Sequence, residues 1–254
     1  MRIARILATD TSNLHYNLAL EQVLLQTLTP ADNWLIIRFW YNPPSVIIGR
    51  SQRIEEEVNL EFCKANNVSI GRRISGGGTV FQDSGSLNVS FFVLKSWLPL
   101  SKHAKVPEVT EFFTDLLIKT LNQTGYQNLE KMGLTNILYK GRKISGSAGY
   151  FSKGKVLHHA TLLHSVNLKN LDAVCDPAKY GPKHKRRSNY FPTTNLPNFN
   201  LSNWQSSLYV GLGDIFQCEP KNVFLKPEED ELARELSKKM YSTQKWIFGG
   251  IRGH

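Results

Sequence analysis

Three consecutive glycines, Gly76 to Gly78, lie between two runs of strand-forming residues and constrain the fold more than any other feature of the sequence. A turn without side chains lets backbone N–H groups approach a bound ligand and permits positive φ angles. Arg72 and Arg73 stand before this turn, so a carboxylate or phosphate could meet free amides and a guanidinium fork. The spacing matches neither a Walker loop nor a dinucleotide-binding fingerprint. The alternative is a glycine-rich hairpin with a solvated arginine pair.

Helical and strand-like patterns alternate along the rest of the chain. Helices are predicted over residues 13–26, 55–66, 109–124 and 227–241. Strands are predicted over residues 34–41, 45–49, 68–73, 87–94, 137–139, 143–150 and 155–163. Mixed strands with helices between groups of them predict an α+β fold, with residues 1–254 as one domain and 176–199 as a long basic loop.

Composition excludes several classes of protein. A hydrophobic content of 41% in 254 residues is too high for a mainly disordered chain. Three cysteines cannot form a disulfide framework and favour a reducing compartment, and no apolar run is long enough to span a bilayer. The net charge of +10 indicates an acidic partner. A nucleic-acid-binding module is one alternative, although no helix-turn-helix or aromatic RNA-binding signature is present.

Two further stretches carry candidate functional side chains. Lys143 begins a strand-like run and is followed by small residues, which leave room for its ammonium group to reach a bound anion. The alternative is one more solvated lysine of a hairpin turn. His158 and His159 are adjacent on a predicted strand and point to opposite faces, so they form a poor metal site. A structural role is therefore expected for this pair.

Together these motifs resemble the lipoate–protein ligase A family, part of the biotin/lipoate ligase and octanoyltransferase superfamily. The resemblance extends over nearly the whole chain, with several distinct motifs in family order. They are Asn17–Glu21, Pro44–Gln52, Glu57–Asn59, Arg72–Val80, Asn88, Lys143–Ala148, His158–Leu163 and Tyr241–Trp246.

The resemblance implies a class II aminoacyl-tRNA-synthetase/biotin-ligase-like mixed sheet flanked by helices, and a two-step reaction. Lipoate attacks the α-phosphate of ATP, with Mg²⁺ on the triphosphate, and the acceptor lysine then displaces AMP from lipoyl-AMP. The implied acceptors are lipoyl domains such as the glycine-cleavage H protein and 2-oxoacid dehydrogenase E2 subunits. A small accessory subunit is a further implied partner, whereas nucleic acid and membranes are not. The implied location is the cytoplasm, or the mitochondrial matrix in a eukaryote.

The resemblance also assigns residues to roles, with the glycine turn and Lys143 on one pocket. Lys143 is the expected catalytic residue, and no metal ligand is assigned. The residues expected to bind lipoate or lipoyl-AMP are Arg72, Arg73, Ser75, Gly76, Gly77, Gly78, Thr79, Ser145, Gly146, Ala148, His159 and Thr161. Those expected at the nucleotide and its phosphates are Val80, Phe81, Asn136, Lys185 and Arg187. Apolar walls for the acyl chain are expected from residues 45–49 and 87–92.

The sequence departs from the family pattern at three places. Gln82 stands where the family usually has His, and Asn136 stands where a nucleotide- and metal-linked Asp is typical. The chain ends at His254, so the family's separate C-terminal accessory domain is expected to be missing. An ATP-independent lipoyl or octanoyl transferase, with Cys175 as its candidate nucleophile, is therefore kept as an alternative. A member that only binds lipoyl-AMP is another.

Overall fold

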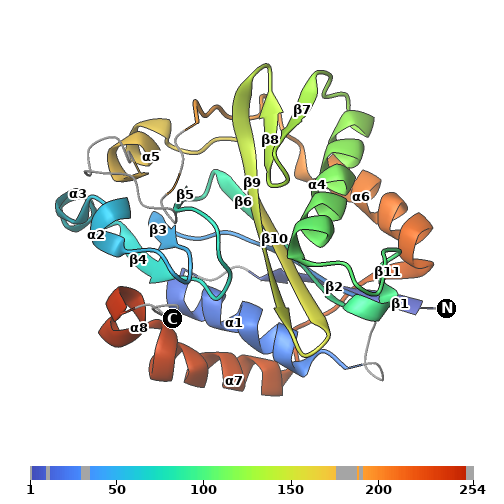
Figure 1. Cartoon of the computed structure of the whole chain (residues 1–254), viewed down its shortest axis with the longest axis horizontal. Helices are drawn as coiled ribbons and strands as arrows, with labels where there is room; N and C mark the ends of the chain where they lie inside the picture. The colour runs from blue at the N-terminus through green and yellow to red at the C-terminus, as the bar shows by residue number, and fades with distance from the viewer. Residues whose placement is uncertain (1, 10–11, 30–34, 176–187, 189–190, 250–254) are drawn as a thin grey trace.

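An eight-stranded mixed sheet forms the centre of the computed structural model, which describes residues 2–9, 12–29, 35–175, 188 and 191–249 (Figure 1). Its strand order is β11-β1-β2-β6-β10-β9-β8-β7. The first three strands are mutually parallel, and every later pairing is antiparallel. The strands are β1 (Arg2–Thr9), β2 (Leu35–Trp40), β6 (Ser86–Leu94), β7 (Leu129–Met132), β8 (Asn136–Tyr139), β9 (Arg142–Ser152), β10 (Lys155–Leu163) and β11 (Cys218–Asn222).

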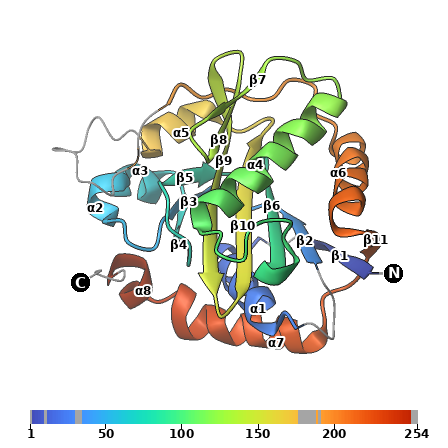
Figure 2. The same ribbon diagram turned by 45° about the vertical axis from the view of Figure 1, so that its right-hand side comes forward.

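Helices cover both faces of this sheet. On one face α4 (Val106–Gln123) and α6 (Leu201–Phe216) bury a core that includes Ile37, Phe91 and Phe113. On the other, α1 (Leu14–Thr27) and α7 (Pro227–Leu236) bury a core with Ile36 and Phe92, and α7 lies alongside α1 (Figure 2). Neighbouring residues of a strand serve opposite faces, so a doubly covered strand such as β2 is buried along its whole length. The α+β prediction of a mixed sheet flanked by helices is confirmed.

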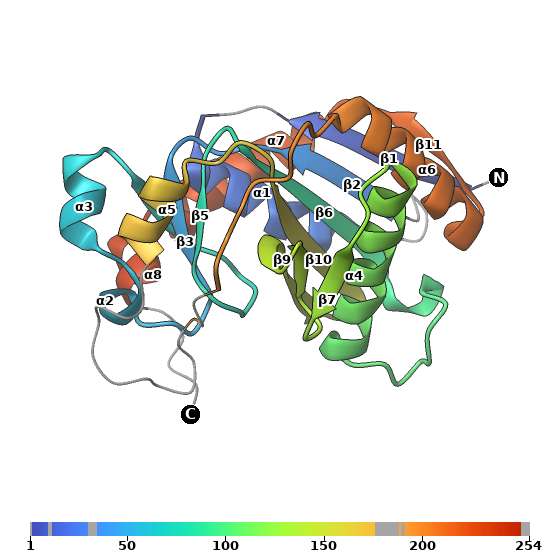
Figure 3. The ribbon, with the colours of Figure 1, turned by 90° about the horizontal axis from the view of Figure 1, so that it is seen from above.

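A smaller sheet carries the glycine turn. Its order is β4-β3-β5, with β3 (Ser45–Ile48) between β4 (Ser69–Arg72) and β5 (Val80–Gln82). Residues 73–79 join the two outer strands and pass the end of β3. Four short helices surround this sheet, at the opposite end of the molecule from β1 and β11 (Figure 3). They are α2 (Ile54–Glu57), α3 (Leu60–Ala65), α5 (Leu168–Cys175) and α8 (Gln244–Gly249).

Several predicted boundaries are wrong. The helix expected over residues 55–66 is two helices, because Val58 is extended and the Asn59 side chain caps α3 by accepting the Phe62 N–H. Helix α4 begins three residues early, with a proline in its first turn. The last predicted helix passes from α7 into a π-helical turn, η3 (Ser237–Tyr241). A 3₁₀ turn, η1 (Lys95–Trp97), follows β6.

Other elements were not predicted at all: β1, β5, β7, β11, α5, α6 and α8. Of the predicted loop 176–199, residues 176–187 and 189–190 lie outside the described part. The remainder contains no helix, and Thr193 forms a parallel bridge with Lys143. In the described part of the chain, no helix has the length and apolar character needed to cross a membrane.

Candidate active site

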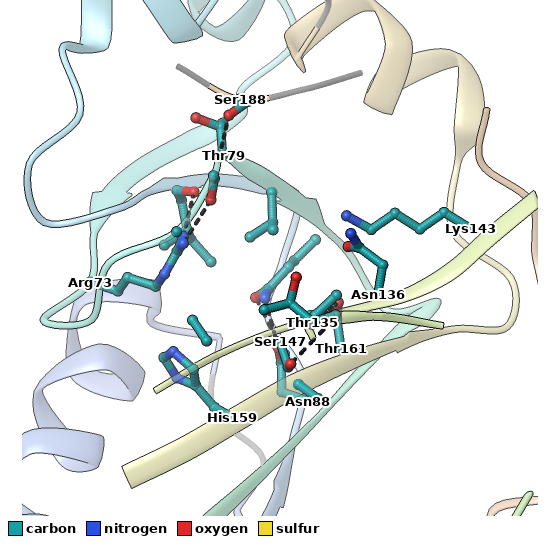
Figure 4. Close-up of a pocket in the computed structure, with 18 of the residues that line it drawn as sticks. Arg73, Thr79, Asn88, Thr135, Asn136, Lys143, Ser147, His159, Thr161 and Ser188 are labelled. Carbon is teal, nitrogen blue, oxygen red and sulfur yellow. Dashed lines mark hydrogen bonds between the residues drawn. The ribbon is translucent and has the colours of Figure 1, made fainter. Parts of the chain in front are cut away.

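A cavity of about 420 Å³ lies between the glycine turn and strands β9 and β10 (Figure 4). Gly77 and Gly78 line one wall, and Lys143 lines another. The two features are 65 residues apart in sequence and belong to different sheets, and both line this cavity. The turn and the lysine therefore share one pocket.

Arg73 holds the glycine turn from inside. Its buried guanidinium donates to the carbonyl oxygens of Gly76 and Gly78 at 2.6 and 2.7 Å. It also donates to the Ile47 carbonyl at 3.2 Å and to Ser75 Oγ at 3.1 Å. Because the Gly76 and Gly78 carbonyl oxygens point to the guanidinium, the backbone N–H groups of the turn remain for other partners. Burial lowers the pKa of Arg73 to about 10, with Glu21 opposing that effect, so the group is charged at neutral pH.

Gly77 has a φ of +87°, in the region that favours glycine. A Cβ on Gly77 would lie 2.9 Å from Arg73 Nη2 and 3.5 Å from the Ala148 Cβ. The close approach of backbone to guanidinium and the positive φ both require glycine at this position.

Arg72 does not line the cavity. Its guanidinium donates to the carbonyl oxygens of Gly49, Arg50 and Gln52 at 2.8 to 3.1 Å. It also donates to the carbonyls of Trp246 and Ile247, and the Trp246 indole donates back to the Arg72 carbonyl. Adjacent residues of an extended strand point in opposite directions, so only one of the two arginines can face the cavity. Arg72 instead fastens α8 to the β3–α2 connection.

A buried hydrogen-bonded pair, Glu21 and His159, forms one end of the cavity. His159 Nδ1 lies 2.9 Å from Glu21 Oε1, and His159 Nε2 lies 2.7 Å from Ser75 Oγ. Ser90 Oγ also donates to Glu21, at 2.7 Å. Burial alone would raise the pKa of the Glu21 carboxyl, but the charge and hydrogen bond of His159 and the Ser90 hydrogen bond outweigh burial and lower it. This end is polar, and its side chains hydrogen-bond to one another.

Lys143 stands at the other end, on β9. Its backbone is fixed by hydrogen bonds to Pro192 and Thr194, at 2.8 and 2.9 Å. Its Nζ lies 5.7 Å from the centre of the Phe191 ring. A Cβ on Gly146 would come within 3.0 Å of that Nζ and 3.6 Å of Asn136 Oδ1, so the small residue gives the lysine room to lie beside the asparagine.

A smaller cavity of about 80 Å³ adjoins this end. It shares Thr79, Val80 and Lys143 with the larger one, and Phe81, Leu163 and Leu171 add apolar surface. A polar head group and a flat apolar group could therefore occupy neighbouring spaces on either side of Lys143.

The structure brings most of the predicted site residues together. Those that line the larger cavity are Arg73, Gly77, Gly78, Thr79, Val80, Asn136, Lys143, Gly146, Ala148, His159 and Thr161. Phe81 lines the smaller cavity but not the larger one. Four predicted residues line neither cavity: Arg72, Ser75, Gly76 and Ser145. Lys185 and Arg187 lie outside the described residues.

The walls are more polar than the sequence predicts. Of the two strands expected to supply apolar surface, only Ile47 and Asn88 line the cavity. Leu18 and Trp40 add apolar surface from other elements. Other lining residues that sequence reasoning missed are Glu21, Ser51, Gln82, Thr135, Ser147, Ala160, Ser188 and Phe191. Glu21, Ser51, Ser147 and Ala160 lie in motifs of the family pattern, and Gln82 stands at one of its positions, which was the available signal; Thr135, Ser188 and Phe191 had none.

Gln82, the departure from the family's histidine, belongs to a buried chain of amides. Asn42 donates to Gln82 Oε1 at 2.7 Å, and Gln82 Nε2 donates to Asn88 Oδ1 at 2.6 Å. The chain continues from Asn42 to Asn17 and from there to the Arg38 guanidinium. Gln82 thereby fixes the orientation of Asn88 in the cavity wall.

The histidine pair faces opposite sides, as predicted. His158 is fully buried and stacks on Phe113, with ring centres 4.9 Å apart. Neither of its ring nitrogens has a hydrogen-bond partner in the structure, and burial lowers its pKa to about 3. Among the described residues, no group of three or more His, Cys, Asp or Glu side chains is placed to hold a metal ion.

The glycine turn of the small sheet and Lys143 of the central sheet face one cavity with several convergent polar groups, which is typical of an enzyme active site. The chain belongs to the lipoyl protein ligase A/B catalytic domain family, whose model matches residues 13–206. It is therefore an enzyme of the lipoate–protein ligase type.

Two of the relatives match over most of both chains. Lipoate-protein ligase A subunit 1 of Thermoplasma acidophilum is 29% identical over 98% of this chain and 97% of its own length. A putative lipoate-protein ligase A of Aeropyrum pernix is 31% identical, over 93% of this chain and 89% of its own. The ligase LplJ of Bacillus subtilis is 35% identical over 62% of this chain, but the match spans only 46% of that longer protein.

Solved structures agree in fold. A putative lipoate protein ligase of T. acidophilum with bound lipoic acid has a TM-score of 0.81 and 27% identity, over 98% of this chain and 100% of its own. A lipoate-protein ligase A bound with ATP has a TM-score of 0.81 and 28% identity, over 98% and 99%. A bipartite ligase of T. acidophilum, described with its E2 lipoyl domain, has a TM-score of 0.82 and 26% identity, over 100% and 99%.

Proposed function

We propose that this chain uses ATP to convert lipoate into lipoyl-AMP and transfers the lipoyl group to a lysine of a lipoyl-acceptor domain. The observation that carries the proposal is the juxtaposition of glycine turn and Lys143 across one cavity, in a chain of this family. The solved relatives with lipoic acid and with ATP support the same two ligands here.

The charges of the cavity orient the acid. At the Glu21–His159 end the polar groups hydrogen-bond to one another, and the Arg73 guanidinium donates to carbonyl oxygens of the glycine turn, whereas Lys143 at the other end is a compact ammonium. The lipoate carboxylate is therefore placed toward Lys143, with the acyl chain and its ring along Leu18, Trp40 and Ile47. Burial of the chain contributes about 0.8 kcal/mol per CH₂, which is a large part of the affinity.

In the first step a carboxylate oxygen attacks the α-phosphorus of ATP and pyrophosphate leaves. Negative charge grows on the phosphoryl oxygens, and Lys143 Nζ and the N–H groups of the glycine turn stabilise it in a site that excludes bulk water. The apolar side cavity, with Phe81, Leu163 and Leu171, takes the nucleotide's flat base.

In the second step the acceptor lysine attacks the acyl carbon of lipoyl-AMP, and AMP leaves with the electron pair of the broken C–O bond. The oxyanion that forms lies beside the carboxyl position of the first step. Lys143 is therefore the group that serves both transition states, which is why it is assigned as the catalytic residue.

Mg²⁺ fits this site as a companion of the triphosphate. It prefers oxygen ligands and usually retains several waters, so few protein ligands are needed. Asn136 Oδ1, beside Lys143, would supply a neutral oxygen where the family pattern has a carboxylate. The ion would neutralise part of the negative charge of the triphosphate. Lys143 would stabilise more of the remaining negative charge than it would if an aspartate stood in place of Asn136.

Acceptor domains and an accessory subunit are the proposed protein partners. The relative described with an E2 lipoyl domain is a bipartite ligase, and this chain is similar to it over its full length. The net charge of +10 favours fast association with acidic acceptor domains.

The test incubates the protein with lipoate, Mg-ATP and an apo acceptor domain, with and without an accessory subunit, and reads the acceptor by intact mass. A lipoyl adduct that requires ATP is expected, together with lipoate-dependent exchange of pyrophosphate into ATP. Acyl transfer from a carrier that needs no ATP and is lost in Cys175→Ala would instead identify a transferase. Tight binding of lipoyl-AMP with no turnover would identify a protein that only binds lipoyl-AMP.

A further inference from the structure

Five buried side chains form one hydrogen-bonded chain that ends in the cavity wall: Arg38, Asn17, Asn42, Gln82 and Asn88. Arg38 donates to Asn17 Oδ1, and Asn17 Nδ2 donates to Asn42 Oδ1 at 2.8 Å. Asn42 Nδ2 donates to Gln82 Oε1 at 2.7 Å, and Gln82 Nε2 donates to Asn88 Oδ1 at 2.6 Å. Each amide therefore accepts from the preceding member on its oxygen and donates to the next from its nitrogen.

The guanidinium of Arg38 fixes this direction. Arginine has five N–H donors and no acceptor, so the amide next to it must present its oxygen. Reversing Asn88 alone would turn its N–H groups toward those of Gln82 Nε2. Reversing Gln82 as well would turn the Gln82 N–H groups toward those of Asn42. Only one orientation of the chain leaves no donor facing a donor.

The chain ends on a hydrogen-bond donor. Asn88 Oδ1 accepts from Gln82, and one N–H of Asn88 Nδ2 reaches Gln82 Oε1 at 3.3 Å. The amide nitrogen has a second N–H, for which the described part of the chain supplies no acceptor. Asn88 is 3% exposed and lines the cavity, so an oxygen of a ligand bound there can accept this N–H.

The register of the central sheet places this donor across the cavity from Lys143. Asn88 of β6 pairs with Thr161 of β10, and Thr161 pairs with Gly146 of β9. Strands lie about 4.8 Å apart, so this row of three residues spans about 10 Å. Lys143 Nζ lies beside Gly146, at one end of the row. An acid group above Thr161 therefore has the Asn88 amide on one side and the ammonium on the other (Figure 4).

We infer that Asn88 is a substrate-binding residue that donates an amide N–H to a carboxyl oxygen of the acid, and that Gln82 is the positioning residue that orients it. The inference rests on the proposed function for the identity of the acid. It also gives a reason for glutamine where the family usually has histidine. A neutral imidazole has one acceptor nitrogen and one N–H, so it can accept from Asn42 and donate to Asn88 as the Gln82 amide does.

The orientation of the chain is tested without ligand, by NMR couplings across hydrogen bonds. A coupling joins the donor nitrogen to the carbonyl carbon of the acceptor. Couplings are expected from Asn42 Nδ2 to Gln82 Cδ and from Gln82 Nε2 to Asn88 Cγ. A coupling from Gln82 Nε2 to Asn42 Cγ would show the opposite direction and would overturn the inference, whatever reaction the protein catalyses.

The role of the donor is tested by calorimetric titration with lipoate. Asn88→Ala should weaken lipoate binding by about 10- to 100-fold, because a hydrogen bond to a charged group is lost. Gln82→Met has no amide to orient Asn88 and should weaken binding by about 3- to 10-fold. Gln82→His should restore most of that loss. Unchanged binding in Asn88→Ala would refute the donor, and a loss in Gln82→His as large as in Gln82→Met would refute the positioning role.

The matched control is Gln26→Met, in an exposed glutamine that does not line the cavity. It should bind lipoate as the unaltered protein does. If the unaltered protein binds no lipoate, the proposed function fails, and the couplings among Asn42, Gln82 and Asn88 still decide the orientation of the chain. If the unaltered protein binds lipoate and Asn88→Ala binds it equally well, the inference alone fails.

Discussion

The substitution Arg73→Lys distinguishes two roles for Arg73: binding the anionic group of a ligand, or holding the glycine turn in place. If the guanidinium binds an anion, another cation should largely replace it. If it holds the turn, another cation should not replace it, because its planar fork reaches four acceptors in different directions: Ser75 Oγ and the carbonyls of Ile47, Gly76 and Gly78. The contacts in the structure favour the second role.

The size of the effect follows from the number of acceptors lost. A lysine ammonium presents its donors from one point and can serve about two of the four groups. Two buried acceptors are then left without a donor, at about 1–3 kcal/mol each. The expected loss is about 2–6 kcal/mol of the free energy of unfolding, a large fraction of the typical total of about 5–15 kcal/mol. At about 2–4 °C per kcal/mol, the melting temperature should fall by about 4–24 °C.

The assay is urea denaturation followed by circular dichroism, with lipoate and ATP binding measured on the same samples. Arg53→Lys is the matched control, since that side chain is 70% exposed and makes one surface ion pair with Glu56. It should change stability by less than about 0.5 kcal/mol. Arg73→Lys with unaltered stability but weakened ligand binding would refute the holding role and restore the anion-binding one.

Three further predictions concern the catalyst, the turn and the core. Lys143→Ala should reduce lipoylation by about 10²–10³-fold while circular dichroism stays unchanged, and normal turnover would remove it from the mechanism. Gly77→Val adds a branched side chain at a φ of +87°, against Arg73 Nη2, and should raise the KM for lipoate; an unchanged KM would place the acid elsewhere. The folded-state pKa of His158 is about 3, well below the unfolded value of about 6.5, so the unfolded chain binds the extra proton and stability falls as the pH drops from about 6.5 toward 3. His158→Phe should therefore lose about 2–3 kcal/mol less than the unaltered protein between pH 7 and pH 4.5, as measured by denaturation at both pH values, and equal losses would contradict the buried neutral state.

Local sequence patterns were enough to predict the helices and strands whose apolar residues recur with a strong period. Helix α1, strands β2, β6 and β10 and the core of α4 lie where the spacing of apolar residues places them. The break at Val58 and Asn59 escaped prediction because the apolar spacing continues across it, and only the Asn59 cap marks the new helix. Strand β11 contains Glu219, Pro220 and Lys221, which do not form a strand pattern; pairing with β1 makes it a strand.

The sequence by itself determined the side-chain-free turn, the lysine followed by small residues and the order of motifs typical of the family. These features are local, since each depends on the backbone freedom or the chemistry of a few adjacent residues. Only the tertiary structure decided that Arg73 faces the cavity while Arg72 is enclosed by backbone carbonyls, and that Glu21 pairs with His159. Which face of a strand is buried, and which distant segment covers it, is set by packing across the sheet, and no single stretch of sequence records that choice.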